Sequence, residues 1–174
     1  LSTLHTNNAL TTIERLIDMG VERYLLSSAL TGIVSQKLAR KLCDHCKQPR
    51  QTTDYEKKVF RDALGIEVNQ VYQAVGCSRC RQGYKGRIAL QEVLLIDQVI
   101  RDAINDDAKK EKIREMVYQS DVITLLQDGL YKVIAGFTTF DEVLKLIELE
   151  DQANAVERIK YQKEKMKEKQ NTQG

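Results

Sequence analysis

The sequence of 174 residues predicts an α/β fold that carries a cysteine-bounded insert and ends in an all-α module. Apolar residues near the start recur at helical spacing, and apolar runs that favour strands lie on either side of two Cys-x-x-Cys pairs. In the last third, polar capping residues and glycines bound several short helices. A hydrophobic content of 42% with 30% charged residues is typical of a soluble globular chain of one or two domains.

Two helices and a strand are expected before the first cysteine. Asn7 or Asn8 can cap the first helix, and Gly20 is a suitable residue to end it. The apolar positions of this helix are Leu10, Ile13, Leu16 and Ile17. The second helix covers about 22–30, and a strand follows over about 33–42. The candidate buried residues of the second helix are Tyr24, Leu25, Ala29 and Leu30.

The four cysteines form two Cys-x-x-Cys pairs, Cys43 with Cys46 and Cys77 with Cys80. Two such pairs bring four thiolate donors together, which is the spacing of a closed, tetrahedral, structural Zn²⁺ site. The alternatives are two redox-active pairs or disulfides. His45 lies between the first two cysteines as a further candidate ligand, but with four thiols available a solvated spacer is the more common role.

The insert 43–86 contains one expected helix and one expected strand. Thr53 and Glu56 have the spacing of a capping box that opens a helix ending at Leu64 and Gly65. A strand is expected over 71–75 and another over 87–96. If 33–42 and 87–96 pair in antiparallel fashion, the metal closes the base of a long hairpin. An insert of this size needs such a metal because its own core is small.

The last third is expected to form a compact helical module over 97–152. Asp97 caps its first helix, and further helices cover about 107–118 and 124–135, the latter closed by Gly136. Thr139 and Glu142 form a second capping box before the last helix. Residues 153–174 are a charged tail that we expect to be helical or disordered.

The net charge of +2 is unevenly distributed. Residues 153–174 hold six Lys or Arg against three Glu, so the rest of the chain is close to electroneutral. This balance argues against nucleic acid as a specific partner, because phosphate neutralisation requires a concentrated basic face. No apolar run approaches the roughly 18 residues of a membrane span.

Several blocks in a fixed order resemble the motor ATPases of type II secretion and type IV pilus assembly. The segment 2–7, Ser-Thr-Leu-His-Thr-Asn, is similar to the histidine box of that family. The segments 35–46 and 77–87 resemble the entry and the exit of its tetracysteine site, and 126–133 with 136–144 resemble its C-terminal helical signature. The resemblance covers about residues 1–150.

The resemblance implies a RecA-like P-loop ATPase fold, of which 1–42 and 87–96 complete the core, 43–86 is the zinc insert and 97–152 the helical C-terminal module. It implies a cytoplasmic homohexamer at the inner face of the cell membrane. This motor binds ATP and Mg²⁺, acts on an inner-membrane platform protein and associates with the membrane through its partners.

The chain departs from the family pattern in its nucleotide-binding residues. No G-x-x-x-x-G-K-[ST] occurs in it, and it begins with Leu1 rather than methionine. We therefore expect the C-terminal portion of a longer ATPase, without ATP hydrolysis of its own. Lys37 stands where the family usually has arginine, and it lacks the bidentate fork of a guanidinium.

Two residues are candidates for nucleotide chemistry in the intact protein. By the resemblance, His5 could sense the γ-phosphate from a strand end, and Arg87 could reach a neighbouring subunit's nucleotide. Surface roles are the simpler alternative for both. The cluster Arg79, Arg81, Lys85 and Arg87 around Tyr84 also leaves open a non-catalytic zinc-ribbon adaptor that binds protein or nucleic acid. A thiol-redox module is a third possibility.

Overall fold

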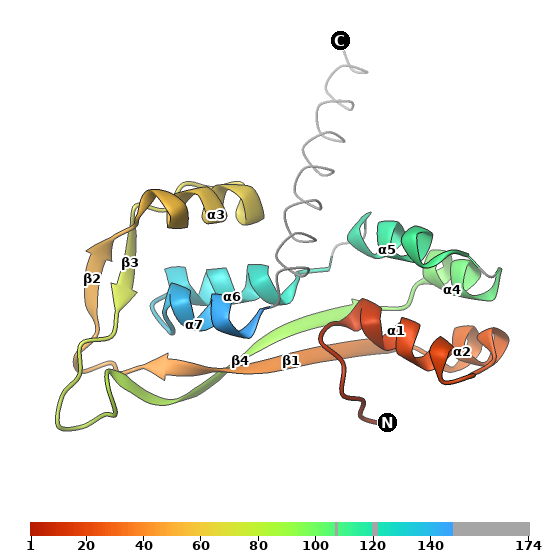
Figure 1. The fold of residues 1–174 in the computed structure, drawn as a ribbon, viewed down its shortest axis with the longest axis horizontal. Coiled ribbons are helices and arrows are strands. Elements are labelled where there is room, and N and C mark those ends of the chain that lie inside the picture. The colour runs from red at the N-terminus through yellow and green to blue at the C-terminus, as the bar shows by residue number, and fades with distance from the viewer. Residues whose placement is uncertain (107, 120–121, 148–174) are drawn as a thin grey trace, which may run out of the picture. The chain divides into compact units, whose positions relative to one another are not determined.

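The computed structural model describes residues 1–106, 108–119 and 122–147 (Figure 1). The expected tail over 153–174 and the end of the expected helical module lie outside these residues. The elements are α1 (Ala9–Asp18), α2 (Arg23–Ala29), β1 (Gly32–Leu42), β2 (Gln48–Gln51), α3 (Asp54–Leu64), β3 (Gln70–Gln73), β4 (Tyr84–Leu95), α4 (Gln98–Asn105), α5 (Lys110–Gln119), α6 (Leu125–Ile134) and α7 (Phe140–Leu146). None of the helices in the described part has the length and apolar character needed to cross a membrane.

The chain forms two compact units. Unit 1 consists of Leu1–Ser35 and Glu92–Ile123, and unit 2 of Gln36–Gln91 and the chain from Thr124 onward. The four helices expected as one module are therefore divided between the units, because α4 and α5 lie in unit 1 whereas α6 and α7 lie in unit 2. The assignment of 1–42 and 87–96 to a RecA-like core stays a prediction.

Helix α1 begins and ends where the sequence predicts. The Asn8 side chain accepts a hydrogen bond from the Thr11 N–H at 2.8 Å, and the Thr11 side chain bonds back to the Asn8 backbone, which satisfies two otherwise unpaired N–H groups. Gly20 follows the helix with φ +81°, the left-handed conformation that glycine adopts without strain. The helix packs on the unit 1 core through Ala9, Leu10 and Ile13.

Helix α2 presents a different face to the core than the sequence analysis predicts. Leu26 is the buried residue, whereas Tyr24 and Leu25 are 59% and 47% exposed. Ala29 is also exposed, and Leu30 is half-buried at the helix end. The prediction was wrong because the helix has only seven residues, too few for periodicity to fix its orientation.

Strands β1 and β4 are hydrogen-bonded neighbours in a two-stranded sheet, and their ribbons run in opposite directions (Figure 1). This confirms the expected hairpin. β4 begins at Tyr84, earlier than predicted, because Arg81 and Tyr84 exchange two backbone hydrogen bonds of 3.0 Å across a tight turn. The two central residues, Gln82 and Gly83, have φ of 53° and 85°, as a type I′ hairpin turn requires.

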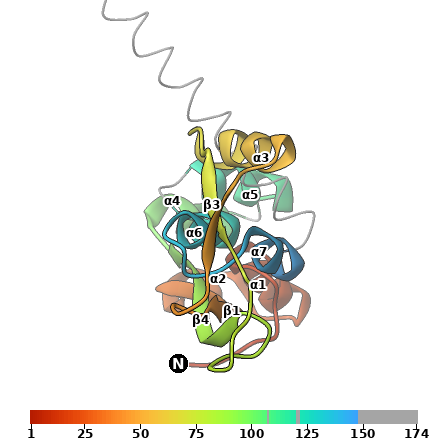
Figure 2. The ribbon, with the colours of Figure 1, turned by 90° about the vertical axis from the view of Figure 1, so that its left-hand side faces the viewer.

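Unit 2 contains a second two-stranded sheet, formed by β2 and β3 (Figure 2). The strands are antiparallel, with Gln48 opposite Gln73 and Gln51 opposite Gln70. The sequence analysis did not predict β2, since Gln48–Gln51 contains proline and no β-branched residue. Helix α3 follows it and confirms the capping box, in which Thr53 N–H donates to Glu56 at 2.7 Å.

The insert and helices α6 and α7 share one core. Phe60 of α3 stacks near Phe140 of α7 with ring centroids 5.7 Å apart, and Gln127 of α6 donates to the Ala63 carbonyl at 3.1 Å. The other buried members of this core are Ala39, Val68, Val71, Leu90, Leu125, Leu126, Leu130, Val133, Val143 and Ile147. The insert therefore has no separate core and depends on helices that lie far along the sequence.

Candidate metal centre

The four cysteine sulfurs converge at one point of unit 2. All four Sγ atoms lie within 4.8 Å of one another, with Cys43 and Cys77 at 4.0 Å, Cys46 and Cys80 at 3.7 Å, and Cys77 and Cys80 at 3.7 Å. Four sulfurs at about 2.3 Å from a tetrahedral ion would be about 3.8 Å apart. A disulfide requires about 2.05 Å, and all four thiols are free. The geometry fits a metal ion, and no disulfide is formed among these thiols.

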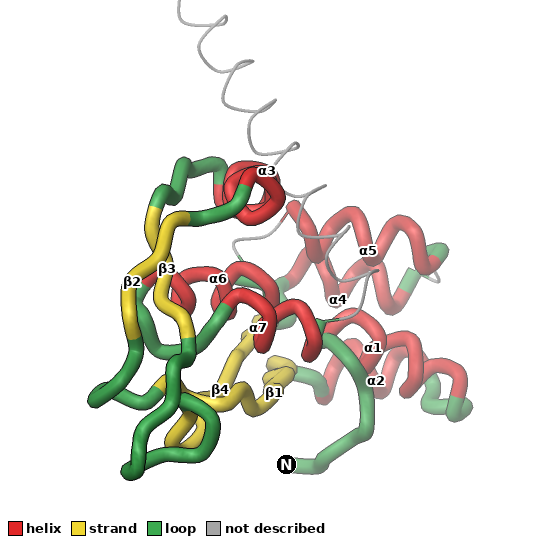
Figure 3. The backbone as a smooth tube through the Cα atoms, turned by 60° about the vertical axis from the view of Figure 1, so that its left-hand side comes forward, coloured by secondary structure: helices red, strands yellow, loops and turns green. Residues whose placement is uncertain are grey.

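Two short turns, joined by one backbone hydrogen bond, position the sulfurs. The N–H groups of Cys46 and Lys47 both donate to the Cys43 carbonyl, at 3.2 and 3.0 Å, and Cys80 N–H donates to the Cys77 carbonyl at 3.3 Å. Cys43 N–H donates to the Gly83 carbonyl at 2.8 Å, which ties the first turn to the second. In Figure 3 these turns are loops at the ends of the strands.

Gly83 is required at its position for two reasons. Its φ is +85°, and a Cβ atom added there would lie 2.6 Å from the Cβ of Ala74 and 2.9 Å from the Val75 nitrogen. No side chain fits at those distances without a backbone shift. The glycine therefore lets the second turn approach the segment that leads into Cys77.

The thiols differ in acidity. Burial raises the pKa of Cys46 to about 12. Burial also acts on Cys80, but hydrogen bonds from the N–H groups of Cys77 and Gly83 outweigh it and lower the pKa of Cys80 to about 7. The Cys77 N–H donates to Cys80 Sγ at 3.3 Å, so the backbone favours the thiolate form of Cys80 that a metal ion binds.

The turn between α6 and α7 is attached directly to the metal-site segment. Leu42 N–H donates to the Phe137 carbonyl at 2.8 Å, and the Lys47 ammonium donates to the Gly136 carbonyl at 2.9 Å. Lys47 also lies 5.3 Å from the ring centroid of Tyr72. A Cβ atom on Gly136 would come within 2.7 Å of that ring, so the glycine allows the turn to pack on β3.

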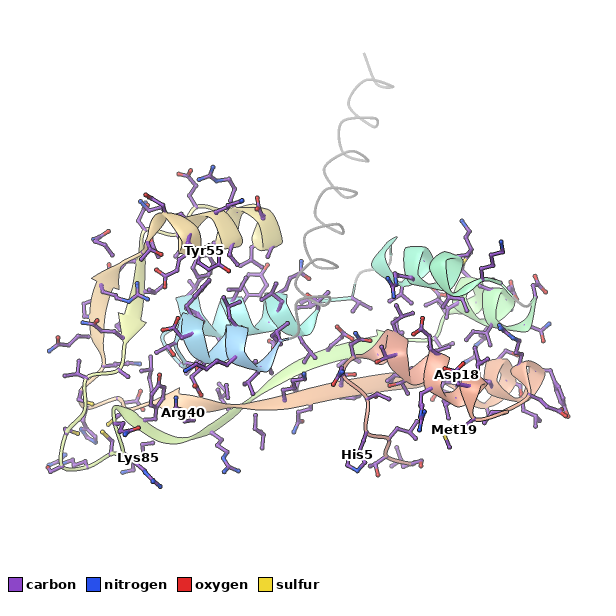
Figure 4. The ribbon with its side chains drawn as sticks, in the orientation of Figure 1. His5, Asp18, Met19, Arg40, Tyr55 and Lys85 are labelled. Carbon is purple, nitrogen blue, oxygen red and sulfur yellow. The ribbon has the colours of Figure 1, made fainter. Side chains whose placement is uncertain are left out.

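A charged pair holds α7 to β1. The Arg40 guanidinium binds both carboxylate oxygens of Glu142, with Nε to Oε2 at 2.8 Å and Nη2 to Oε1 at 2.6 Å. Arg40 also lies 4.0 Å from the ring centroid of Tyr84, whose hydroxyl is 3.0 Å from the Thr139 hydroxyl. The Arg40 hydrogen bond holds the pKa of Glu142 below its usual range. Figure 4 labels Arg40 on strand β1.

This pair changes one detail of the predicted capping box. Thr139 accepts from the Glu142 N–H at 3.4 Å, as predicted, but the Glu142 carboxylate bonds to Arg40 instead of returning to the Thr139 N–H. The sequence analysis missed Arg40, Lys47 and Tyr84 as structural partners of the metal-site segment. Their signal in the sequence is weak, since the partners Glu142, Gly136 and Thr139 lie 102, 89 and 55 residues away, respectively.

His45 does not belong to the sulfur cluster. Its ring is exposed, and its Nδ1 lies 3.5 Å from Arg79 Nη1. Among the described residues, the group able to hold a metal contains only the four cysteines. The geometry agrees with the expected role of His45 as a solvated spacer.

His5 and Arg87 lie in different units. His5 is exposed in the segment before α1, which has no helix or strand and so differs from the strand end expected for it (Figure 4). Thr6 bonds to Thr12 at 2.7 Å, and the Ala9 N–H donates to the buried carboxylate of Glu92 at 2.8 Å, which fixes the chain just after His5. Arg87 is exposed on β4 of unit 2.

Comparison with known proteins places these features in a family. The family described as "Type II/IV secretion system protein" matches residues 1–145. The chain is 43% identical over 147 residues to "Type II secretion system protein E" of Dickeya dadantii, covering 84% of this chain and 29% of that protein. It is 40% identical over 146 residues to "Type IV pilus assembly ATPase PilB" of Thermus thermophilus, covering 83% of this chain and 16% of that protein.

A third relative agrees with these two. "Type II secretion system ATPase E" of Vibrio cholerae is 37% identical over 147 residues, covering 84% of this chain and 29% of that protein. The chain thus spans less than a third of the length of these relatives. With the match over 1–145, the chain belongs to the type II/IV secretion system protein family.

Proposed function

We propose that this chain is the distal portion of a hexameric ATPase that powers type II protein secretion or type IV pilus assembly by ATP hydrolysis. The observation that carries the proposal is the similarity of nearly the whole described chain to relatives named as secretion and pilus ATPases. The nucleotide-binding loop is expected in the part of those relatives that this chain does not span. The motor would work in the cytoplasm on an inner-membrane platform protein, with ATP and Mg²⁺ as cofactors.

The four cysteines are proposed to hold a structural Zn²⁺. Thiolates are the ligands this ion prefers, and four of them leave no open position for substrate or water. Cys43, Cys46, Cys77 and Cys80 would then close both turns, while Lys47 and Leu42 hold the attached α6–α7 turn. Metal analysis of the purified chain should give one zinc per chain, and none when Cys46 and Cys80 are both replaced by serine.

His5 and Arg87 are proposed to act on nucleotide only in the assembled motor. A neutral imidazole can both donate and accept a hydrogen bond near a γ-phosphate, and an exposed guanidinium can stabilise phosphate charge across a subunit boundary. Their location in different units is compatible with contributions to two different nucleotide sites of a ring.

A chimera tests the proposal. The matching C-terminal region of the Dickeya dadantii relative is replaced by this chain, and phosphate release from ATP is measured. Hydrolysis near the level of the parent relative is expected, with a loss of at least about tenfold for His5→Ala or Arg87→Ala and little change for Lys58→Ala. A folded chimera without hydrolysis, or one insensitive to both substitutions, would contradict the assignment of the motor or of these two residues.

The basic cluster beside the second cysteine pair favours one alternative, a zinc-ribbon adaptor without catalysis. Arg79, Arg81, Lys85 and Arg87 are all exposed. An adaptor for nucleic acid would bind duplex DNA with a steep dependence on salt, because phosphate contacts release counterions. Flat, negligible DNA binding would remove this alternative. A thiol-redox module would keep its fold in a chelator and change it in an oxidant.

A further inference from the structure

The segment that carries His5 is held to the rest of unit 1 by a short run of hydrogen bonds. His5 itself is exposed in the chain that precedes α1 (Figure 4). Three residues later the chain becomes buried, because Asn8 is 7% and Ala9 0% exposed. The position of His5 therefore depends on what fixes these few residues.

Glu92 of β4 supplies the long-range contact of this run. Its carboxylate Oε1 accepts a hydrogen bond from the Ala9 N–H at 2.8 Å, across 83 positions of the sequence. Ala9 is the first residue of α1, and the first N–H groups of a helix have no carbonyl partner within it. The Asn8 side chain caps the Thr11 N–H, so Glu92 serves an N–H group that this cap does not reach.

Burial makes this contact strong. Glu92 is 8% exposed, whereas acidic side chains are almost never buried without a partner. Away from water, the hydrogen bond to Ala9 is strengthened. Loss of the acceptor would be costly, because the buried N–H would stay unpaired. The start of α1 is therefore tied to β4 more firmly than a carboxylate on the surface could tie it.

Hydroxyl groups extend the fixed region toward His5. Thr12 Oγ1 donates to the Asn8 carbonyl at 3.1 Å, and a hydroxyl has one proton to donate. In the 2.7 Å contact between Thr6 and Thr12, Thr6 is therefore the donor and Thr12 the acceptor. Thr6 follows His5 directly, so the backbone on the C-terminal side of His5 is tied to α1.

We propose that Glu92 is a positioning residue for His5. It holds the first amide of α1 and, through α1 and the bond between Thr6 and Thr12, determines where the imidazole can reach. The inference rests on the proposed function, in which His5 acts on the γ-phosphate of ATP in the assembled motor. Glu92 touches no nucleotide in this role and acts only through the backbone that carries His5.

Position matters because His5 would have to meet the phosphate at hydrogen-bond distance, about 2.6–3.2 Å, at the moment of reaction. An imidazole on an untethered segment would reach that position only part of the time. The chemical step would then slow, while the binding of ATP would change little. The expected signature of a lost Glu92 contact is a lower kcat with an unchanged KM.

Two conservative variants separate the hydrogen bond from the negative charge. Glu92→Gln keeps an acceptor oxygen at the same reach and removes the charge. Glu92→Asp keeps the charge but is one carbon shorter, which withdraws the oxygen by up to about 1.5 Å and breaks the contact with Ala9. Glu92→Gln should therefore behave like wild type, and Glu92→Asp like Glu92→Ala.

Nuclear magnetic resonance of the chain tests the structural step without nucleotide. In Glu92→Ala and Glu92→Asp, the Ala9 amide should exchange at least about tenfold faster, and the order parameter of the Thr6 amide should fall below about 0.6. The chain has two histidines, so the resonances of His45 in unit 2 are an internal reference that should not move. Asp97→Ala is the matched control, because it removes a carboxylate that caps α4 of the same unit, and it should leave both amides unchanged.

Steady-state ATP hydrolysis by the chimera with the Dickeya dadantii relative tests the functional step. Glu92→Ala and Glu92→Asp should lower kcat at least about tenfold with KM within about twofold. Glu92→Gln and Asp97→Ala should stay within about twofold of the unmodified chimera. The double variant Glu92→Ala/His5→Ala should be no slower than His5→Ala alone, because both changes remove the same interaction.

Several results would overturn the proposal. One is a folded Glu92→Ala chain in which Ala9 exchange and Thr6 order are unchanged. Another is a Glu92→Gln variant that loses as much kcat as Glu92→Ala, since the charge and not the hydrogen bond would then be required. Additive losses in the double variant have the same consequence, because Glu92 would act independently of His5. If His5→Ala leaves hydrolysis intact, the proposed role of His5 fails, and the Ala9 and Thr6 amides alone decide whether Glu92 fixes this segment.

Discussion

Replacement of Gly129 by alanine tests how closely α6 and α7 pack in unit 2. Gly129 lies in the middle of α6, and a Cβ atom added there would be 2.5 Å from Cγ1 and 3.2 Å from Cγ2 of Val143 on α7, and 3.4 Å from Leu90 Cδ1. Carbon atoms in good contact are about 3.5–4.0 Å apart. The new methyl group therefore overlaps Val143 by about 1 Å.

Two opposing effects decide whether Gly129→Ala stabilises or destabilises the chain. Alanine in a helix interior is about 1 kcal/mol more favourable than glycine. Overpacking a core costs about 1–3 kcal/mol. Val143 is fully buried, and a β-branched side chain in a helix has essentially one rotamer, so it cannot turn aside. The cost of the steric overlap should exceed the gain in helix propensity, so Gly129→Ala should destabilise the chain by about 1 kcal/mol.

A double-mutant cycle measured by urea denaturation checks this expectation. Val143→Ala alone should cost about 2 kcal/mol through lost burial. In the double variant the new methyl group occupies part of the vacated space, so its cost should be at least about 1 kcal/mol less than the sum of the two single costs. A Gly129→Ala variant that is more stable than wild type, with additive costs in the cycle, would refute the close approach of α6 and α7.

Three further perturbations concern the metal-site segment. Removal of metal by a strong chelator should increase hydrogen exchange of amides in β2, β3 and the α6–α7 turn while leaving α1 unchanged; equal increases in both units would contradict this. Glu142→Gln should cost about 1 kcal/mol at about pH 7, discounted for the half-exposed Arg40, and the difference should start to shrink as the pH falls below about 4.3, the ordinary pKa of glutamate. The reason is that Glu142, with its lowered pKa, stabilises the fold at pH values above the pKa of unfolded glutamate, and this contribution is lost as the pH falls through the pKa of the folded state. If wild type and Glu142→Gln gave parallel curves of stability against pH, the ion pair between Arg40 and Glu142 would not be supported. Gly83→Ala should destabilise the chain by about 2 kcal/mol or more and weaken zinc binding, measured by competition with a coloured chelator. An unchanged zinc affinity would show that the conformation of this turn does not determine metal binding.

Local signals in the sequence were sufficient for most helix boundaries. The capping residues Asn8, Thr53, Asp97, Thr124 and Thr139 all accept hydrogen bonds at predicted helix starts. These predictions succeed because the cap and its N–H partner are separated by only three residues. The cysteine spacing succeeds for the same reason, since each turn is determined within one Cys-x-x-Cys pair.

Predictions failed where distant residues decide the structure. The face of α2 depends on α4, where Arg101 donates to the carbonyls of Ser27 and Ser28 at the end of the helix. Strand β2 exists because β3 pairs with it, not because Gln48–Gln51 favours a strand. Neither partner is visible in the local sequence. The same limit explains why Glu142 was assigned only to a capping box.

The contacts around the cysteines suggest why a metal and a helical pair belong together in this unit. The insert lacks a core of its own and packs on α6 and α7 through Phe60 and Phe140. Lys47, next to Cys46, holds the turn between those helices, and Arg40, just before Cys43, holds α7. A metal that closes the two turns would therefore fix the segment from Arg40 to Lys47, which is hydrogen-bonded to α7 and to the α6–α7 turn. Loss of the metal should loosen a packed unit rather than a peripheral loop, and this is why the chelation experiment compares exchange in β2, β3 and the α6–α7 turn with exchange in α1.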